Sequence, residues 1–319
     1  MVGTCSESRV QNATLQDLTP SCDFAAHVAD WVEPIRINYL GYEVAESPPN
    51  GQGMAALMAL GMMEPFDVAS LGPGHPDYWH LAIESMKLAF RDVHAQLTGP
   101  AYMNVSISAM LDRDFLKRRA ALIDMKRAQD FSPSAELRGG TVYLNAADES
   151  GMMVSLIQSN YMGFGSGLVV DGISLQNRAN GFVLDPMQQN CVAGGKRPFH
   201  TIIPGFILKD GQPQSAFGVL GGHVQPQGHL QTAMRMIDFG ENPQAALDGP
   251  RFWVEQGLAL DLESWTPNVV RESLVARGHQ FKENKDSYMD FGSGQIIWKT
   301  DHGYVTGSDC RRDGGAVGF

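Results

Sequence analysis

Long hydrophobic runs are missing from this chain of 319 residues, and no stretch approaches the roughly 20 apolar residues that a membrane-spanning helix needs. Cysteine is scarce, and the four thiols are too widely spaced for a C-x-x-C pair, so no thiolate metal site is expected: Cys5, Cys22, Cys191 and Cys310. The first 22 residues lack the basic-then-apolar pattern of a secretory leader. We therefore expect no membrane partner and, by default, a cytoplasmic location.

Positive charge is also in short supply, because 24 Lys and Arg stand against 35 Asp and Glu, giving a net charge of −11 at pH 7. Such an excess of negative charge argues against nucleic acid as a partner. No internal repeat or low-complexity segment is present. With 43% hydrophobic and 18% charged residues, the composition is that of a globular protein with one large or two small domains.

Two apolar runs, residues 142–147 and 152–157, flank a polar turn that contains Gly151. This pattern predicts a β-hairpin, and the uninterrupted apolar runs indicate strands buried on both faces. Directly before the first run stands Thr141, which follows two glycines. The tract from Arg138 to Phe182 is the part of the chain around which we expect the functional site to form.

A threonine after a small residue can cut its own chain. The Thr141 hydroxyl can attack the carbonyl carbon of Gly140 where the backbone bends, and the amino group released then lies beside the same hydroxyl as a general base. The alternative is ordinary turn chemistry, with a threonine placed at a strand edge for its β-propensity.

Strands and helices are both predicted, in an order that favours an α+β fold with two sheets covered by helices. The segment 126–137 reads as a polar linker. Strands are expected at residues 35–39, 42–44, 174–182, 201–208, 215–220, 252–262 and 295–298, and helices at residues 52–63, 75–96, 111–123, 226–239, 243–247 and 268–277.

From Asp23 to Phe319 the chain resembles the gamma-glutamyltransferase (gamma-glutamyltranspeptidase) family, most closely its bacterial gamma-glutamyltransferase-like branch. The resemblance is carried by the hairpin and, in the same order, by the segments 162–167 (MGFGSG), 194–198 (GGKRP) and 220–223 (LGGH). It implies an N-terminal nucleophile hydrolase with a four-layer αββα sandwich, made as a precursor that cleaves itself. Residues 1–140 would be the mainly helical, N-terminally truncated part of the large subunit, and residues 141–319 the small subunit, both within one domain. The family's upstream arginine, which holds the α-carboxylate of the donor, has no counterpart here.

The resemblance also implies roles for individual residues. Thr141 is the expected nucleophile, and Ser159 stands where the family has a hydroxyl that bonds it; the alternative for Ser159 is a polar residue that ends a strand. Gly221 and Gly222 match the oxyanion hole, where backbone N–H groups approach a developing oxyanion; the alternative is a tight turn.

The expected substrate end departs from the family pattern. His200 and Thr201 take the places of two serines that bind the glutamyl α-carboxylate, and Tyr161 replaces an asparagine beside the nucleophile. Arg178 and Gly181 stand where the family has an amide and an acid for the donor's α-amino group. A guanidinium suits a carboxylate without an adjacent amine, as in a glutaryl group. The alternative for Arg178 is an internal ion pair, for example with Asp185.

We therefore expect a gamma-glutamyltransferase-like acyltransferase or hydrolase that is processed at Gly140–Thr141. Its partners would be a small glutathione-type or glutaryl-type amide donor and a water or amine acceptor, with the two pieces of the precursor paired. No metal or organic cofactor is expected. The competing interpretation is a non-catalytic fragment or inactive relative that lacks half of the large subunit.

Overall fold

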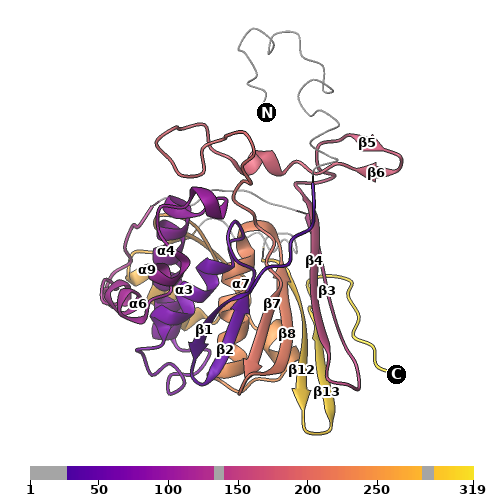
Figure 1. Ribbon diagram of the computed structural model, residues 1–319. Coiled ribbons are helices and arrows are strands. Elements are labelled where there is room, and N and C mark those ends of the chain that lie inside the picture. The colour runs from indigo at the N-terminus through magenta and orange to yellow at the C-terminus, as the bar shows by residue number, and fades with distance from the viewer. Residues whose placement is uncertain (1–26, 133–139, 282–290) are drawn as a thin grey trace. The chain divides into compact units, whose positions relative to one another are not determined.

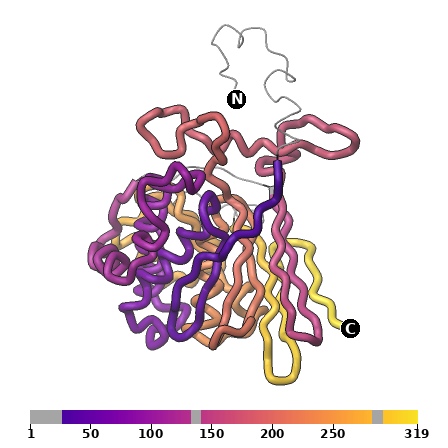
Figure 2. Tube along the Cα trace, viewed as in Figure 1, coloured from indigo at the N-terminus to yellow at the C-terminus, as the bar shows by residue number. Residues whose placement is uncertain are grey.

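The computed structural model describes residues 27–132, 140–281 and 291–319 (Figures 1 and 2). Residues 133–137 of the predicted linker, and Arg138 and Gly139 before the expected cleavage site, lie outside the described residues. The chain divides into two units, 1–33 and 34–319. In the first unit, the described residues 27–33 contain no helix or strand; the helices and strands of the described residues belong to the second unit.

A six-stranded antiparallel sheet forms the centre of this unit, in the order β1-β2-β7-β8-β12-β13. The β2–β7 pair joins a strand that precedes Thr141 to one that follows it, so the two parts of the chain share one sheet. The strands are β1 (Ile35–Tyr39), β2 (Tyr42–Glu46), β7 (Gly205–Lys209), β8 (Gln212–Leu220), β12 (Ser293–Thr300) and β13 (Gly303–Ser308).

Helices cover one face of this sheet (Figure 1). Helix α3 (Gly53–Met63) is apolar all round its circumference, and every residue in it is buried between the sheet and the helices α4 (Pro76–Gln96) and α7 (Gln225–Ile237). The His75 side chain accepts a hydrogen bond from Asp77 N and so begins α4. Smaller elements complete this side: α5 (Ile107–Met110), α6 (Arg113–Ala120), α8 (Pro243–Asp248), α9 (Asn268–Ala276), β9 (Phe252–Gln256), β10 (Ala259–Leu262) and β11 (Gln280–Phe281).

The predicted hairpin lies on the opposite face, as β3 (Gly140–Ala147) and β4 (Met153–Tyr161). It packs on β8 and β12: Asn145 Nδ2 donates to Ala216 O at 3.1 Å, and the Tyr143 ring lies where a Cβ at Gly218 would be only 2.5 Å away. The expectation of burial on both faces is wrong. Alternate residues of the hairpin strands point away from the sheet. Val142 is 56% exposed, and the side chains of Leu144, Val154 and Leu156 are 42–45% exposed.

Two further expectations from the sequence are corrected. The strand expected over residues 174–182 is only β6 (Ile173–Ser174), paired with β5 (Val169–Val170); the chain then forms a 3-10 turn, Arg178–Gly181, closed by Phe182 N donating to Ala179 O. Residues 252–262 are two antiparallel strands, β9 and β10, because Gly257 adopts a positive φ of 58° and reverses the chain.

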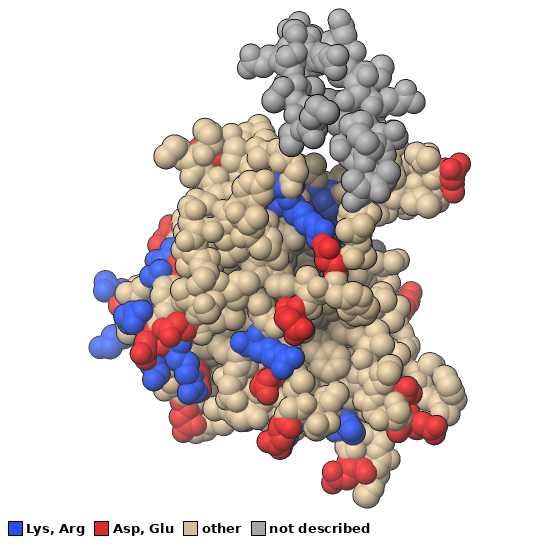
Figure 3. All heavy atoms as spheres, viewed as in Figure 1, with Lys and Arg blue, Asp and Glu red and all other residues tan. Residues whose placement is uncertain are grey.

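Charge is mixed over the visible face, where acidic and basic side chains are interspersed rather than gathered into one basic tract (Figure 3). Within the described residues, no helix combines the length and apolar character needed to cross a membrane.

Candidate active site

Thr141 lies at an irregularity of the hairpin. Gly140 pairs with Tyr161 but Val142 pairs with Gln158, so Ser159 and Asn160 together oppose Thr141. This is a β-bulge, a feature that is common beside active sites because it re-aims side chains. The Gly140–Thr141 peptide bond, where cleavage is expected, lies within β3.

The Thr141 side chain faces the six-stranded sheet. Because the extra residue is on β4, the alternation along β3 continues, and Thr141 shares its face with Tyr143 and Asn145. Asn145 contacts Ala216 and Tyr143 contacts Gly218, so a step of two residues back along β3 corresponds to a step of two residues forward along β8. We infer by continuing this step that Thr141 lies toward Leu220, the residue before Gly221. Its Oγ1 is buried and has no hydrogen-bond partner among the described residues.

The turn after β8 is built by Gly221 and Gly222, whose φ angles are 130° and 69°. A Cβ on Gly221 would stand 2.5 Å from Val224 Cγ1, so the turn excludes side chains for reasons of space and of backbone conformation. It leads through the short 3-10 turn Gly222–Val224 into α7. The arrangement leaves the peptide backbone as the surface of this turn, which an oxyanion hole requires.

Arg178 is buried, 6% exposed, beside the bulge. Its NH1 donates to Thr201 Oγ1 at 2.7 Å and its NH2 to Ser159 O at 3.4 Å, and its Cζ lies 4.7 Å from the centre of the Tyr161 ring. Burial lowers the pKa of Arg178 to about 10, so it is still charged at neutral pH. Among the described residues no carboxylate pairs with it, and Asp185 instead accepts from Met187 N and the Gln188 amide. Arg178 Nε has no partner within the same residues.

Tyr161 contributes a second polar group without a partner. The residue is buried and adopts a φ of 81°, unusual for a side chain of its size. Burial raises the pKa of its hydroxyl, so the phenol is neutral, and that hydroxyl bonds to none of the described residues. The Ser159 hydroxyl accepts from Tyr161 N at 2.9 Å, and it makes no hydrogen bond to Thr141 Oγ1 in the described structure.

His200 directly precedes Thr201, the residue whose hydroxyl accepts from Arg178. His200 Nδ1 accepts from Ile202 N at 3.3 Å, while burial and the nearby charges of Arg178 and Arg197 lower the pKa of His200 to about 3. It is therefore neutral at physiological pH. The structure thus brings Arg178, Thr201, Tyr161 and Ser159 into one contact chain beside Thr141.

Sequence reasoning missed Gln52, whose buried carboxamide donates to backbone oxygens of both Thr201 and Gly222. The only local signal was its place after Pro48-Pro49-Asn50-Gly51, a break before an apolar helix. That signal predicts a helix cap and gives no reason for bonds to residues 149 and 170 positions away.

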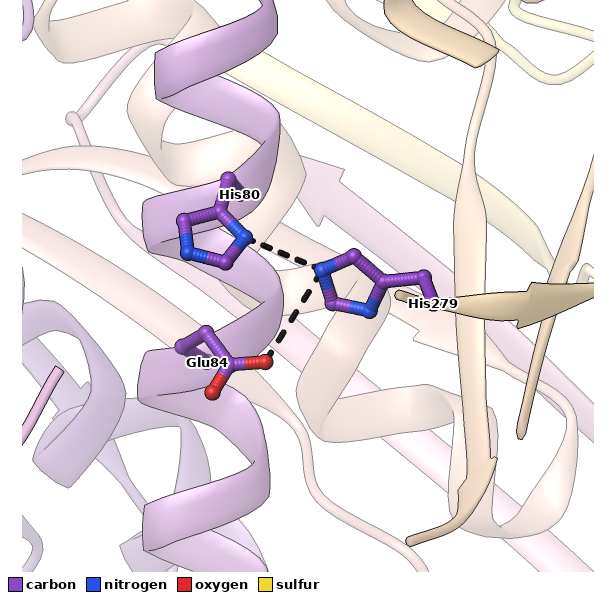
Figure 4. A group of neighbouring side chains, drawn as sticks. All are labelled: His80, Glu84 and His279. Atoms are coloured by element: carbon purple, nitrogen blue, oxygen red, sulfur yellow. Dashed lines mark hydrogen bonds and ion pairs between the residues drawn. The ribbon is translucent and has the colours of Figure 1, made fainter. Parts of the chain in front are cut away.

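A separate group of possible metal ligands was also missed: His80, Glu84 and His279 (Figure 4), with one ligand atom from each within 4.8 Å of the others. The Lys87 ammonium already donates to Glu84 Oε1 at 2.8 Å and lies 3.4 Å from His279 Nδ1. His80 and His279 bond each other at 2.9 Å. Because Lys87 supplies the positive charge, we assign this group as a hydrogen-bonded structural cluster between α4 and the start of β11.

His223, next to Gly222, provides a test of stability against pH. It stacks on Phe199 at 5.5 Å, and both its ring nitrogens lack a partner among the described residues. Burial, with a smaller effect of His94, lowers the pKa of His223 to about 3. In the unfolded chain His223 binds a proton below about pH 6.5, whereas in the folded protein it does so only near pH 3. The stability that the neutral, buried His223 contributes is therefore complete above about pH 6.5 and is lost as the pH falls toward 3.

Because of His223, we expect the free energy of unfolding to be lower at pH 5 than at pH 7.5 by about 2 kcal/mol. In His223→Leu this part of the decrease should be absent. Urea unfolding of both proteins at the two pH values measures it. Replacing the exposed His302 by leucine is the control and should keep the wild-type loss. An identical loss in His223→Leu and wild type would contradict the assignment.

The family profile described as Gamma-glutamyltranspeptidase matches residues 17–319. The chain is 34% identical over 305 residues to the glutathione hydrolase-like YwrD proenzyme of Bacillus subtilis (strain 168), covering 93% of this chain and 58% of that protein. It is 33% identical over 308 residues to the acylase ACY 1 proenzyme of Pseudomonas sp. (strain SE83), covering 94% and 54%.

Among solved structures, the crystal structure of cephalosporin acylase from Bacillus halodurans is similar, with 45% identity and a TM-score of 0.86, over 92% of this chain and 54% of that one. The chain thus spans about half the length of the relatives it matches. These similarities confirm the α+β fold of N-terminal nucleophile hydrolase type that the sequence predicted. The chain belongs to the gamma-glutamyltranspeptidase family.

Proposed function

We propose that this protein is a self-processing amide hydrolase and acyltransferase in which Thr141 is the nucleophile. The observation that carries the proposal is the set of three buried polar atoms without partners in the described structure, Thr141 Oγ1, Tyr161 Oη and Arg178 Nε, on neighbouring residues at one bulge. Buried polar groups are usually hydrogen-bonded, so three such atoms on residues in contact support the proposal that a ligand binds here.

Processing comes first. Thr141 Oγ attacks the Gly140 carbonyl carbon, the C–N bond breaks to give an ester, and water hydrolyses the ester to leave a Gly140 carboxylate and a free Thr141 amine. Since β2 and β7 are hydrogen-bonded across the two parts, the pieces 1–140 and 141–319 would stay paired in one sheet. The proenzyme names of the relatives agree with a cleaved precursor.

Turnover then uses the new terminus. The Thr141 amine, with a pKa near 8 in ordinary surroundings, takes the Oγ proton as Oγ bonds to the substrate carbonyl carbon. The oxyanion forms against the Gly221–Gly222 turn, the proton passes to the leaving amine, and water or another amine takes the acyl group from Thr141.

The charge distribution selects the acyl group. Arg178 is a buried cation without an acid among the described residues, and a substrate carboxylate would supply one. Where the family places an acid for the donor's amine, Gly181 leaves no room for any side chain, because a Cβ there would be 2.7 Å from Phe199 O. We therefore propose donors of the glutaryl type, with γ-glutamyl amides such as glutathione as poorer substrates.

Purified wild-type protein tests the proposal. We expect two species on intact-mass analysis, residues 1–140 and 141–319, together with release of p-nitroaniline from an acyl p-nitroanilide. A folded chain that stays whole at 34.8 kDa and hydrolyses no amide would instead identify a non-catalytic fragment.

A further inference from the structure

Gln52 joins two parts of the proposed site through a single side-chain amide. The residue is fully buried, and its Nε2 lies 2.6 Å from Thr201 O and 2.8 Å from Gly222 O. Both neighbours are carbonyl oxygens, which only accept, so the nitrogen must be the atom between them and both of its hydrogens are used.

The loop that carries Gln52 is held firmly against the segment before Thr201. His200 N donates to Asn50 O at 2.9 Å and Gln52 N to His200 O at 2.9 Å, a pair of backbone bonds like that of adjacent strands. The Asn50 side chain adds a bond to Pro198 O at 2.5 Å. The backbone therefore fixes Gln52 on one side, and its side chain reaches from there to the Gly221–Gly222 turn.

The two acceptor residues belong to two different parts of the proposed site, one that binds the substrate carboxylate and one that binds the oxyanion. Thr201 carries the hydroxyl that binds Arg178, the proposed partner of the substrate carboxylate. Gly222 belongs to the turn against which the oxyanion would form. The distance between Arg178 and the Gly221–Gly222 turn must match the distance between the carboxylate and the reacting carbonyl of the acyl group.

We propose that Gln52 is a positioning residue that sets this distance, an inference that rests on the proposed function. The two donated bonds are the hydrogen bonds that hold this amide, because Gln52 Oε1 has no partner among the described residues.

The first test is independent of turnover. Gln52→Met keeps the length of the side chain and removes both donors. Hydrogen–deuterium exchange should show faster uptake in peptides covering 198–203 and in peptides covering 220–226, with no change in β9 (Phe252–Gln256). The matched control is Gln214→Met, because Gln214 Nε2 also donates to a backbone oxygen, Lys299 O, but at the far end of β8. That variant should leave both site peptides unchanged.

The second test separates positioning from stability. Rates are expressed per active site, titrated by the burst of p-nitroaniline, on a glutaryl anilide and on the uncharged butyryl anilide. Gln52→Met should lower kcat on both by roughly ten- to a hundredfold, because the oxyanion donors are misplaced. It should raise KM only for the glutaryl anilide, by roughly tenfold, through the loosened Thr201–Arg178 pair.

The outcomes are distinguishable. Faster exchange in only one of the two site peptides, or in neither, overturns the link. Changed exchange with unchanged kcat and KM per active site reduces Gln52 to a structural role and overturns the positioning inference. Wild-type protein without any turnover sinks the proposed function and the catalytic consequence with it, while the exchange result still decides whether the link exists.

Discussion

The Thr141→Ala protein is expected to stay uncut and to lose amide hydrolysis. Both proposed reactions begin with a bond from Thr141 Oγ, and removing a nucleophile from a hydrolase of comparable logic costs roughly a millionfold in kcat. The variant should fold, because Thr141 Oγ1 makes no hydrogen bond in the described structure that its loss could break. We expect the free energy of unfolding to change by less than about 1 kcal/mol.

Intact mass and the rate of p-nitroaniline release measure this result. Thr141→Ser retains a hydroxyl and should still process and turn over. Thr306→Ala makes the same deletion at an exposed position of β13 and should behave as wild type. Cleavage of Thr141→Ala between residues 140 and 141, or a wild-type rate in it, would show that another group is the nucleophile.

The second large effect concerns the carboxylate of the substrate. In wild type, a glutaryl anilide should be turned over faster than a γ-glutamyl anilide, since Arg178 repels an α-ammonium. A charge-assisted bond to the buried Arg178 is worth about 1.5–3 kcal/mol, so Arg178→Gln should lower kcat/KM for the glutaryl anilide by roughly ten- to a hundredfold.

Butyryl anilide, which has no carboxylate, should be insensitive to the same change. Arg197→Gln removes an equal charge from an exposed neighbour of the site and should alter none of these rates strongly, because solvent screens it. A faster γ-glutamyl reaction in wild type, or a glutaryl rate that ignores Arg178→Gln, would show that Arg178 does not bind the substrate carboxylate.

Local pattern was a good guide where one short segment carries the information. The apolar runs on either side of a glycine-containing turn predicted a β-hairpin, and the structure has it as β3 and β4, with Thr141 near the start of β3. The helix expected at residues 75–96 is present as α4 (Pro76–Gln96), and Trp79, Ile83 and Phe90 lie buried within it.

Pattern failed where a neighbouring layer decides the outcome. Val142 and Leu144 are apolar, and apolar runs predict burial, yet β3 packs on β8 and β12 through one face only. Asp185 was a reasonable partner for Arg178 by proximity in sequence, but the 3-10 turn carries the guanidinium toward Thr201 and Ser159 instead.

By itself, the sequence determined the α+β class and the order of most elements, because these depend on spacing within about ten residues. The role expected of Thr141 came from the resemblance to a family, and it stays a prediction. Only the tertiary structure decided which groups meet. Gln52 bonds oxygens of residues 149 and 170 positions away, and His80 bonds His279 at a separation of 199. The buried atoms without partners at Thr141, Tyr161 and Arg178 likewise exist only once the hairpin covers the sheet, because in the unfolded chain water would bond each of them.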